Sequence, residues 1–292
     1  MNIGILDLGI FDLENETAEN LLNQSFSCVE KADILGFSRY WFAEHHAPDT
    51  AWRNTELIVG LAAGYTERIK IGSAGIILRY NSPYRVACNF RLNSALYNDR
   101  IEVGIAWGNT PKKYHEYLSD IPVESINMNK KHRELISFLR NSHKNINIPP
   151  YNTNPPDIYT LSNGFEGMDY AIENDLNYCI SLIHGTKWNE KLKNAINEFR
   201  DKYFLSNNRM PKIILACGGV CAESDKKAQE IQKRYLSNFS TWEPNLTGSV
   251  ETIKDTLNYL KKESGIDDFV FCDLSPSYRK IETLNLLSKL IK

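Results

Sequence analysis

Short apolar runs alternate along this chain with longer amphipathic stretches, and this alternation predicts its secondary structure. The apolar runs are four to six residues long, and most lack a strict alternation of apolar and polar positions. Such runs suit parallel strands that are buried on both faces. Strands are predicted at Ile3–Asp7, Tyr40–Ala43, Ile69–Ala74, Ile101–Ala106, Ile158–Leu161, Leu176–Ser181, Lys212–Ala216 and Asp268–Cys272.

The longer stretches carry apolar residues at helical spacing and end on residues that favour helix termini. Ser82-Pro83 is a good helix start, whereas Gly36 and Gly265 are good helix stops. Helices are predicted at Thr17–Leu35, Thr55–Thr66, Pro83–Tyr97, Phe165–Asn174, Trp188–Phe204, Ser224–Ser237, Val250–Ser264 and Arg279–Ile291.

Eight strands that alternate with helices predict an α/β protein, a (β/α)8 TIM barrel that forms one domain over residues 1–292. A doubly wound open sheet is the alternative, and it is weakened because no G-x-G-x-x-G pattern follows the first strand. The segment Trp107–Pro156 interrupts the alternation of strands and helices, and it forms a long insertion after the fourth predicted strand. This insertion is expected to form a lid or a substrate pocket, or else a surface loop.

Composition excludes several classes of function. The net charge is −2 with scattered basic residues, which argues against nucleic-acid binding. The chain starts without the basic and apolar regions of a signal peptide, and no apolar run approaches the roughly 18 residues of a membrane span. We therefore expect a cytoplasmic protein. Six cysteines are too few for a disulfide framework, and the spacing of Cys217 and Cys221 does not fit a zinc site, so no metal is expected.

The run Glu44-His45-His46 holds the strongest candidate chemistry. It directly follows the predicted strand Tyr40–Ala43, and a helix follows about a dozen residues later. The carboxyl ends of barrel strands form the active-site face of a TIM barrel. A histidine there can carry protons near neutral pH. The three residues are therefore candidate catalytic residues, and a solvated loop is the alternative.

These residues belong to a longer pattern that resembles the bacterial luciferase-like flavin monooxygenases. The resemblance covers nearly the whole chain but is specific only in the first hundred residues. It rests on Gly36-Phe37, Trp41, Ala43-Glu44-His45-His46, Leu61-Ala62-Ala63, Thr66, Arg68-Ile69, Ile71-Gly72-Ser73, Ile76-Ile77-Leu78, Ser82-Pro83 and Asp99-Arg100-Ile101-Glu102-Val103-Gly104-Ile105.

The resemblance implies a barrel, usually dimeric, that binds reduced FMN or the deazaflavin coenzyme F-420 at the carboxyl ends of its strands. Such proteins insert oxygen from O2 into small substrates, with FMN supplied by a flavin reductase, or they transfer hydride. His45 matches the family's active-site histidine and would act as the acid or base. Glu44 would orient an imidazole, or instead pair with Arg39 or Arg68.

The resemblance also implies cofactor-binding residues at the strand ends. Ser73, Ala74 and Gly75 end the third strand, where the family's backbone approaches the flavin, sometimes through a non-prolyl cis peptide. Small residues permit that approach. Asp7 would face the same opening, or form a salt bridge with a barrel arginine.

The segments that are expected to bind the cofactor phosphate differ from the family's usual sequence. Trp107 stands where the family commonly has an arginine, and an indole does not replace a guanidinium clamp. Ser162, Asn163 and Gly164 still offer groups for an anion, but Gly167 replaces a hydroxyl residue. Other arginines are candidates for the missing charge, namely Arg79, Arg85, Arg91 and Arg100.

Three functions stay open on this basis. The first is a reduced-FMN-dependent monooxygenase, and the second is a deazaflavin-dependent reductase or dehydrogenase. The third is a non-catalytic flavin-binding protein, or the partner subunit of a luciferase-like heterodimer. Helix Thr55–Thr66, with Leu57 and Leu61, is apolar enough to form a dimer interface or to pack on its own barrel. His184 and Trp52 are further residues that either reach the site or lie outside it.

Overall fold

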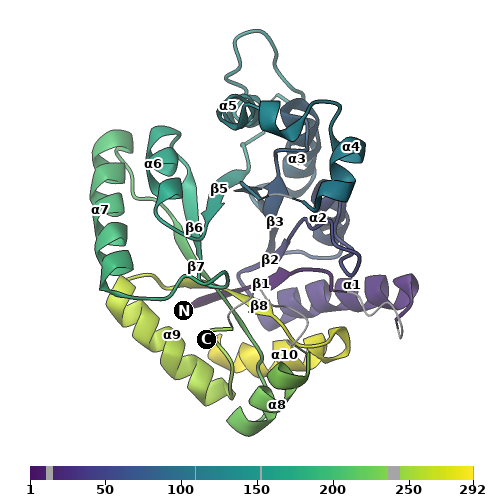
Figure 1. Cartoon of the computed structure of the whole chain (residues 1–292), viewed down its shortest axis with the longest axis vertical. Coiled ribbons are helices and arrows are strands. Elements are labelled where there is room, and N and C mark those ends of the chain that lie inside the picture. Colours follow the sequence, from purple (N-terminus) through teal and green to yellow (C-terminus); the bar gives the residue numbers. More distant parts are fainter. Residues whose placement is uncertain (11–15, 109, 152, 236–243, 292) are drawn as a thin grey trace.

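Eight parallel strands form a closed barrel in chain order (Figure 1). The computed structural model describes residues 1–10, 16–108, 110–151, 153–235 and 244–291. The strands are β1 Asn2–Asp7, β2 Arg39–Phe42, β3 Lys70–Ile77, β4 Ile101–Ala106, β5 Asp157–Ser162, β6 Asn177–Ser181, β7 Ile213–Gly219 and β8 Asp268–Asp273. The predicted TIM barrel is therefore confirmed, and the open sheet is excluded because β1 pairs with β8.

Helices surround this barrel in the order predicted from the sequence (Figure 1). Gly36 ends the first helix with a φ of 83°, and the Ser82 side chain caps the third. The principal helices are α1 Ala18–Leu35, α2 Thr55–Gly64, α3 Pro83–Tyr97, α6 Glu166–Glu173, α7 Glu190–Asn207, α8 Asp225–Tyr235, α9 Val250–Ser264 and α10 Lys280–Leu287. Residues 236 and 237, predicted as the end of a helix, lie outside the described residues.

The insertion after β4 has secondary structure of its own. It contains α4 His115–Leu118 and α5 Met128–Leu139, together with the short 3-10 turns Lys112–Tyr114 and Val123–Ser125. Helix α5 packs beside α3 at one end of the molecule (Figure 1). Arg91 of α3 is 2% exposed and donates hydrogen bonds to the carbonyls of Leu139, Ile148 and Pro150. Because these contacts anchor the later part of the insertion, it is a packed element and not only a surface loop.

A buried ionic network occupies the amino-terminal end of the barrel. Glu102 of β4 is fully buried and accepts hydrogen bonds from Arg39 Nε at 3.0 Å and Trp41 Nε1 at 2.7 Å. Arg39 also pairs with Asp268 of β8, and Lys70 Nζ lies 3.4 Å from Glu102. A buried ionic layer at this end contributes to stability and not to catalysis, because the opposite end carries the chemistry in TIM barrels.

Among the described residues, no helix is long and apolar enough to cross a membrane, and no cluster of three or more His, Cys, Asp or Glu side chains could hold a metal ion. All six cysteines are free. Burial raises the pKa of the Cys217 and Cys221 thiols to about 12, so both are neutral near pH 7. They behave as small apolar residues of the core.

Candidate functional site

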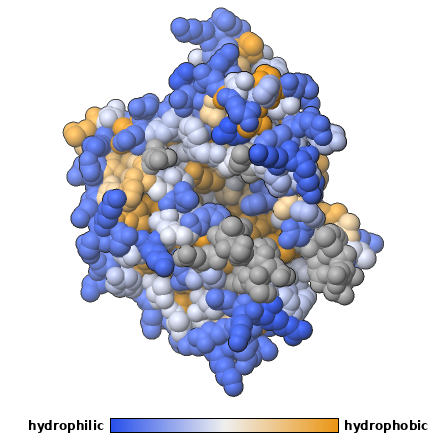
Figure 2. Space-filling model, viewed as in Figure 1, coloured by the Kyte–Doolittle hydropathy of each residue, from blue (hydrophilic) through white to orange (hydrophobic). Residues whose placement is uncertain are grey.

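A cavity of about 690 Å³ opens at the carboxyl ends of the strands. Apolar residues appear within the hollow in Figure 2, while hydrophilic residues dominate the surrounding surface. Such a concave and mostly apolar cavity with a few polar groups is the usual form of a small-molecule site. Its walls include Leu6, Leu8, Trp41, Glu44, His45, Ala74, Gly75, Ile77, Trp107, Asn129, Leu161, Ser162, Asn163, Tyr170, Cys179, Ser181, Ile183, His184 and Ala216.

The end of β3 brings bare backbone to the wall of this cavity. The Ala74–Gly75 peptide bond is cis, as the resemblance suggested, and the register between β3 and β4 shifts here. A Cβ atom on Gly75 would lie 2.5 Å from Leu161 Cδ1 and 2.9 Å from the carbonyl oxygen of Gly104. Only glycine fits this position without displacing backbone. Ser73 lies outside the wall, fully buried against Gly104.

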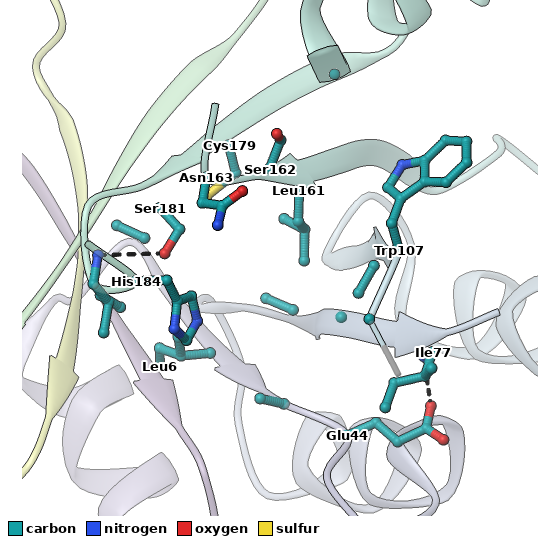
Figure 3. A pocket seen from close by; sticks show the side chains of 18 of the residues that line it. Leu6, Glu44, Ile77, Trp107, Leu161, Ser162, Asn163, Cys179, Ser181 and His184 are labelled. Carbon is teal, nitrogen blue, oxygen red and sulfur yellow. Dashed lines mark hydrogen bonds between the residues drawn. The ribbon is translucent and has the colours of Figure 1, made fainter. Parts of the chain in front are cut away.

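Glu44 is held by three groups and orients the second histidine, not the first. Its carboxylate accepts hydrogen bonds from the Ile77 backbone N–H at 2.8 Å and from the Asn81 side chain. His46 Nε2 lies 2.8 Å from Glu44 Oε1. Neither expected arginine partner is used, since Arg39 pairs with Glu102 and Arg68 with Asp33. Figure 3 shows the bond from Glu44 to Ile77 at the edge of the cavity.

Two imidazoles line the cavity. His45 comes from the end of β2, and His184 follows β6. Burial lowers the pKa of His45 below its ordinary value. Burial and the nearby His45 lower the pKa of His184. Both side chains are therefore neutral near pH 7, which is the form that accepts a proton. The sequence left the place of His184 open, and the structure puts it in the wall.

Asp7 lies away from this cavity, in an ion pair with the tail helix. Lys280 Nζ of α10 contacts Asp7 Oδ1 at 2.7 Å, and the Tyr40 hydroxyl donates to Asp7 Oδ2 at 2.8 Å. Burial alone would raise the pKa of Asp7, but the Lys280 ammonium holds it below its ordinary value. The expected barrel arginine is thus replaced by a lysine, and the carboxylate has a structural partner. Trp52 is also part of the core, 4% exposed and packed on Phe42.

Trp107, His132 and Tyr170 form an aromatic group at the opposite side of the cavity from His184. The ring centroids of Trp107 and His132 are 4.0 Å apart, and Tyr170 lies edge-on to Trp107 at 5.4 Å. Figure 3 shows Trp107 and His184 on opposite sides, with Leu161, Ser162 and Asn163 between them. His132 was missed in the sequence, because it lies in the polar insertion and no motif marks it.

The loop after β5 is held by hydrogen bonds between its own residues and by a bond from Tyr178. Gly164 N–H donates to Ser162 Oγ at 3.1 Å, and the Tyr178 hydroxyl donates to the Gly164 carbonyl at 2.5 Å. Gly164 is therefore absent from the cavity wall, whereas Ser162 and Asn163 belong to it. A Cβ atom on Gly167 would lie 2.8 Å from the Tyr178 ring and 2.9 Å from Ser162 Cβ. The hydroxyl residue expected from the family therefore has no room at position 167.

Protonation of His132 is expected to destabilise the fold as the pH falls. The side chain is fully buried, its ring nitrogens have no hydrogen-bond partner among the described residues, and burial lowers its pKa to about 4. An unfolded chain protonates this residue near pH 6.5, so stability is lost from there down toward pH 4. At about pH 5 the loss is about 2 kcal/mol relative to neutral pH.

The measurement is urea unfolding of the wild type and His132→Phe at neutral pH and near pH 5. The variant keeps an aromatic ring against Trp107 but removes the titrating group. The wild type should lose about 2 kcal/mol more than the variant over this range. Equal losses in both proteins would show that His132 is not the group responsible.

Curated relatives share much of this chain. The uncharacterized protein YwcH of Bacillus subtilis is 26% identical over 237 residues, which is 75% of this chain and 68% of that protein. The oxygenase component of the flavin-dependent trigonelline monooxygenase of Acinetobacter baylyi is 22% identical over 253 residues, 80% of this chain and 69% of its own.

Solved structures share the fold, and the family profile gives the assignment. MsnO8 in its apo form superposes with a TM-score of 0.84 at 22% identity, covering 99% of this chain and 97% of that one. The oxygenating constituent of 3,6-diketocamphane monooxygenase of Pseudomonas putida, in complex with FMN, gives 0.77 at 16%, covering 99% and 97%. An F420-dependent secondary alcohol dehydrogenase gives 0.72 at 15%, covering 100% and 99%. The profile of the luciferase-like monooxygenases matches residues 1–267. The chain therefore belongs to the luciferase-like monooxygenase family.

Proposed function

We propose that the protein is a monooxygenase that uses reduced FMN and O2 to oxidise a small organic substrate. The observation that carries this proposal is the cavity that is lined by both His45 and the bare Ala74–Gly75 backbone. A flavin reductase is the expected source of reduced FMN, in line with a relative named as an oxygenase component. His45 is the proposed acid or base.

The cavity fits the ring end of a flavin. Gly75 leaves the backbone of β3 bare, and Leu6, Leu8 and Ala216 give apolar surface on the walls. A flat aromatic ring system gains from such surface by burial and close contact. The residues proposed to hold the ring are Ala74 and Gly75, with Ser162, Asn163 and Trp107 toward its side chain.

Bound reduced FMN would supply two electrons to O2, so that one oxygen atom enters the substrate and the other leaves as water. The protein's own residues have the remaining tasks. His45, neutral near pH 7, accepts or returns a proton within the cavity. Glu44 fixes the loop by its bonds to Ile77 and His46, so that the position of the neighbouring His45 is defined. The apolar walls exclude water from the reacting atoms.

An anaerobic titration of the purified protein with reduced FMN, read by flavin fluorescence or calorimetry, tests the proposal. Reduced FMN should bind with a dissociation constant in the micromolar range. Oxygen and a panel of small organic compounds are then added, and oxygenated product is sought by mass spectrometry. If neither oxidised nor reduced flavin binds, the proposal is wrong.

Hydride transfer with the deazaflavin coenzyme F-420 is the second candidate. It stays open because Trp107 stands where the family commonly has the arginine that binds the FMN phosphate, and because an F420-dependent secondary alcohol dehydrogenase shares this fold. Titration with the deazaflavin in parallel separates the two candidates, because exclusive binding of the deazaflavin would point to a reductase or dehydrogenase. Failure of both cofactors would favour a non-catalytic subunit that needs a related partner.

We further propose that the protein is a homodimer through α2 and α3. Four leucines on these two neighbouring helices are each about half exposed or more: Leu57, Leu61, Leu92 and Leu96. Asn93 of α3 donates a hydrogen bond to the Glu56 carbonyl of α2, which holds the helices together. Several exposed large apolar side chains on two neighbouring helices are typical of an association surface. A second copy of the chain would bury it.

The double substitution Leu61→Lys with Leu96→Lys is expected to give a monomer. Two buried, unpaired ammonium groups on each subunit would raise the dissociation constant by about 100-fold or more. Light scattering after gel filtration measures the mass. Leu205→Lys is the matched control, because Leu205 is 83% exposed on α7, across the molecule from α2 and α3 in Figure 1. An unchanged mass for the double variant would contradict this interface.

A further inference from the structure

The described wall of the cavity contains no lysine or arginine. The only carboxyl side chain of this wall is that of Glu44, and its basic side chains are the imidazoles of His45 and His184. The residues outside the described ranges contain no lysine or arginine either, apart from Lys292. A phosphate group carries about 1.5 to 2 negative charges near pH 7. Burial of such a group without a cation is costly.

The arginines that the sequence offered as substitutes have other contacts or lie elsewhere. Arg91 is buried against carbonyls of the insertion, and Arg100 donates to Thr66 and to the Ala63 carbonyl. Arg85 is exposed on α3, and Arg79 is not part of the cavity wall. None of the four supplies charge to the wall.

The wall groups on the side of the cavity where a phosphate clamp is expected are neutral, and the exposed Arg133, whose charge acts on Tyr170, is not part of the wall. The Trp107 indole packs at a tilt against His132, which burial keeps neutral near pH 7 with a pKa of about 4. The Tyr170 hydroxyl has no hydrogen-bond partner among the described residues and is available to a neutral polar group. Ser162 Oγ already accepts the Gly164 N–H, and position 167 has no space for a hydroxyl side chain. The indole of Trp107 and the phenol of Tyr170 in the wall suit an uncharged polyol better than a phosphate.

We propose that this site recognises the flavin ring and its ribityl chain but not the terminal phosphate, so that it binds riboflavin as tightly as FMN. The proposal rests on the proposed flavin-dependent function and adds the form of flavin that the site accepts. A guanidinium clamp would favour FMN over riboflavin by about tenfold or more. Without it, the two flavins should differ by less than about threefold.

Anaerobic titrations with reduced FMN and reduced riboflavin, at low and at moderate salt, test the inference. The expected result is a ratio of dissociation constants near one that does not change with salt, since no ionic contact is screened. Inorganic phosphate should not compete with FMN. A preference for FMN of about tenfold or more, with strong salt dependence, would overturn the inference while leaving the proposed function intact. Binding of neither flavin would overturn both.

Trp107→Arg supplies a cation at the expected clamp position. This variant should bind FMN about tenfold more tightly than riboflavin, and the readout is this ratio within the variant and not its affinity relative to the wild type. Trp107→Phe is the matched control, because it keeps a neutral ring beside His132 and should keep the ratio near one. A phosphate preference that appears in the phenylalanine variant would show that a phosphate clamp exists elsewhere in the site, which would overturn the argument that the site lacks one. The wild-type ratio stands by itself if the arginine variant does not fold.

Discussion

Replacement of His45 by asparagine is expected to lower kcat/KM about 100-fold or more for any substrate that the wild type oxygenates. The imidazole lies in the cavity wall, and burial lowers its pKa, so the wild type carries a neutral base near pH 7. Asparagine keeps a similar size and polarity but neither accepts nor returns a proton. Affinity for reduced FMN should change by less than about threefold, which places the loss in the chemical step.

The pH dependence gives this prediction a second measurement. In the wild type, kcat/KM should fall on the acid side with an apparent pKa below about 6.5, since protonated His45 is not a base. This acid limb should disappear in His45→Asn. His184→Asn is the matched control, because it removes the other imidazole of the same wall and should keep the limb. If the limb instead disappears only in the His184 variant, the proton carrier is His184.

The sequence predicts the barrel well because each strand is marked by a local sequence pattern. Each strand is a short apolar run between amphipathic helices, and parallel strands in a closed barrel are buried on both faces. The run at Ile69–Ala74 marks the start of β3, although the strand continues to Ile77. That extension depends on pairing with β4 across the irregularity beside the cis peptide, which is a tertiary contact.

The site is predicted where a residue's place follows from the end of a strand. His45, Ala74, Gly75, Ser162 and Asn163 all reach the cavity wall for this reason. Whether they bind flavin or carry protons stays a prediction. His46, Ser73, Gly164 and Asp7 also stand at or near strand ends, yet they lie outside the wall. A single position along a strand end decides whether a side chain faces the cavity or the surrounding protein.

Long-range partners explain the rest. Asp7 binds Lys280, a residue 273 positions later on the tail helix, and nothing local to either residue indicates this pair. His132 reaches Trp107 because α5 of the insertion packs against α3. A polar stretch without a motif gives no register for such a contact. These parts of the structure therefore follow from packing and not from a local pattern.

Substitution of Arg39 by methionine is expected to destabilise the protein by about 3 to 5 kcal/mol. Arg39 is 5% exposed and lies between two carboxylates, those of Glu102 and Asp268. Methionine has a similar length but no charge, so the fully buried Glu102 would lose its nearest cation, with only Lys70 Nζ at 3.4 Å left. Urea unfolding near neutral pH measures the change.

The pair of Arg68 and Asp33, in which the arginine side chain is exposed, provides the matched control. Arg68 Nε lies 3.8 Å from Asp33, and its side chain is 72% exposed, so Arg68→Met should cost less than about 1 kcal/mol. Adding Glu102→Gln to Arg39→Met should recover part of the loss, because the remaining partners of residue 102 then face a neutral amide. If the Arg39 variant loses no more than the Arg68 variant, the buried network does not stabilise the barrel. If the added Glu102→Gln recovers nothing, the loss comes from packing of the long side chain and not from the unpaired carboxylate.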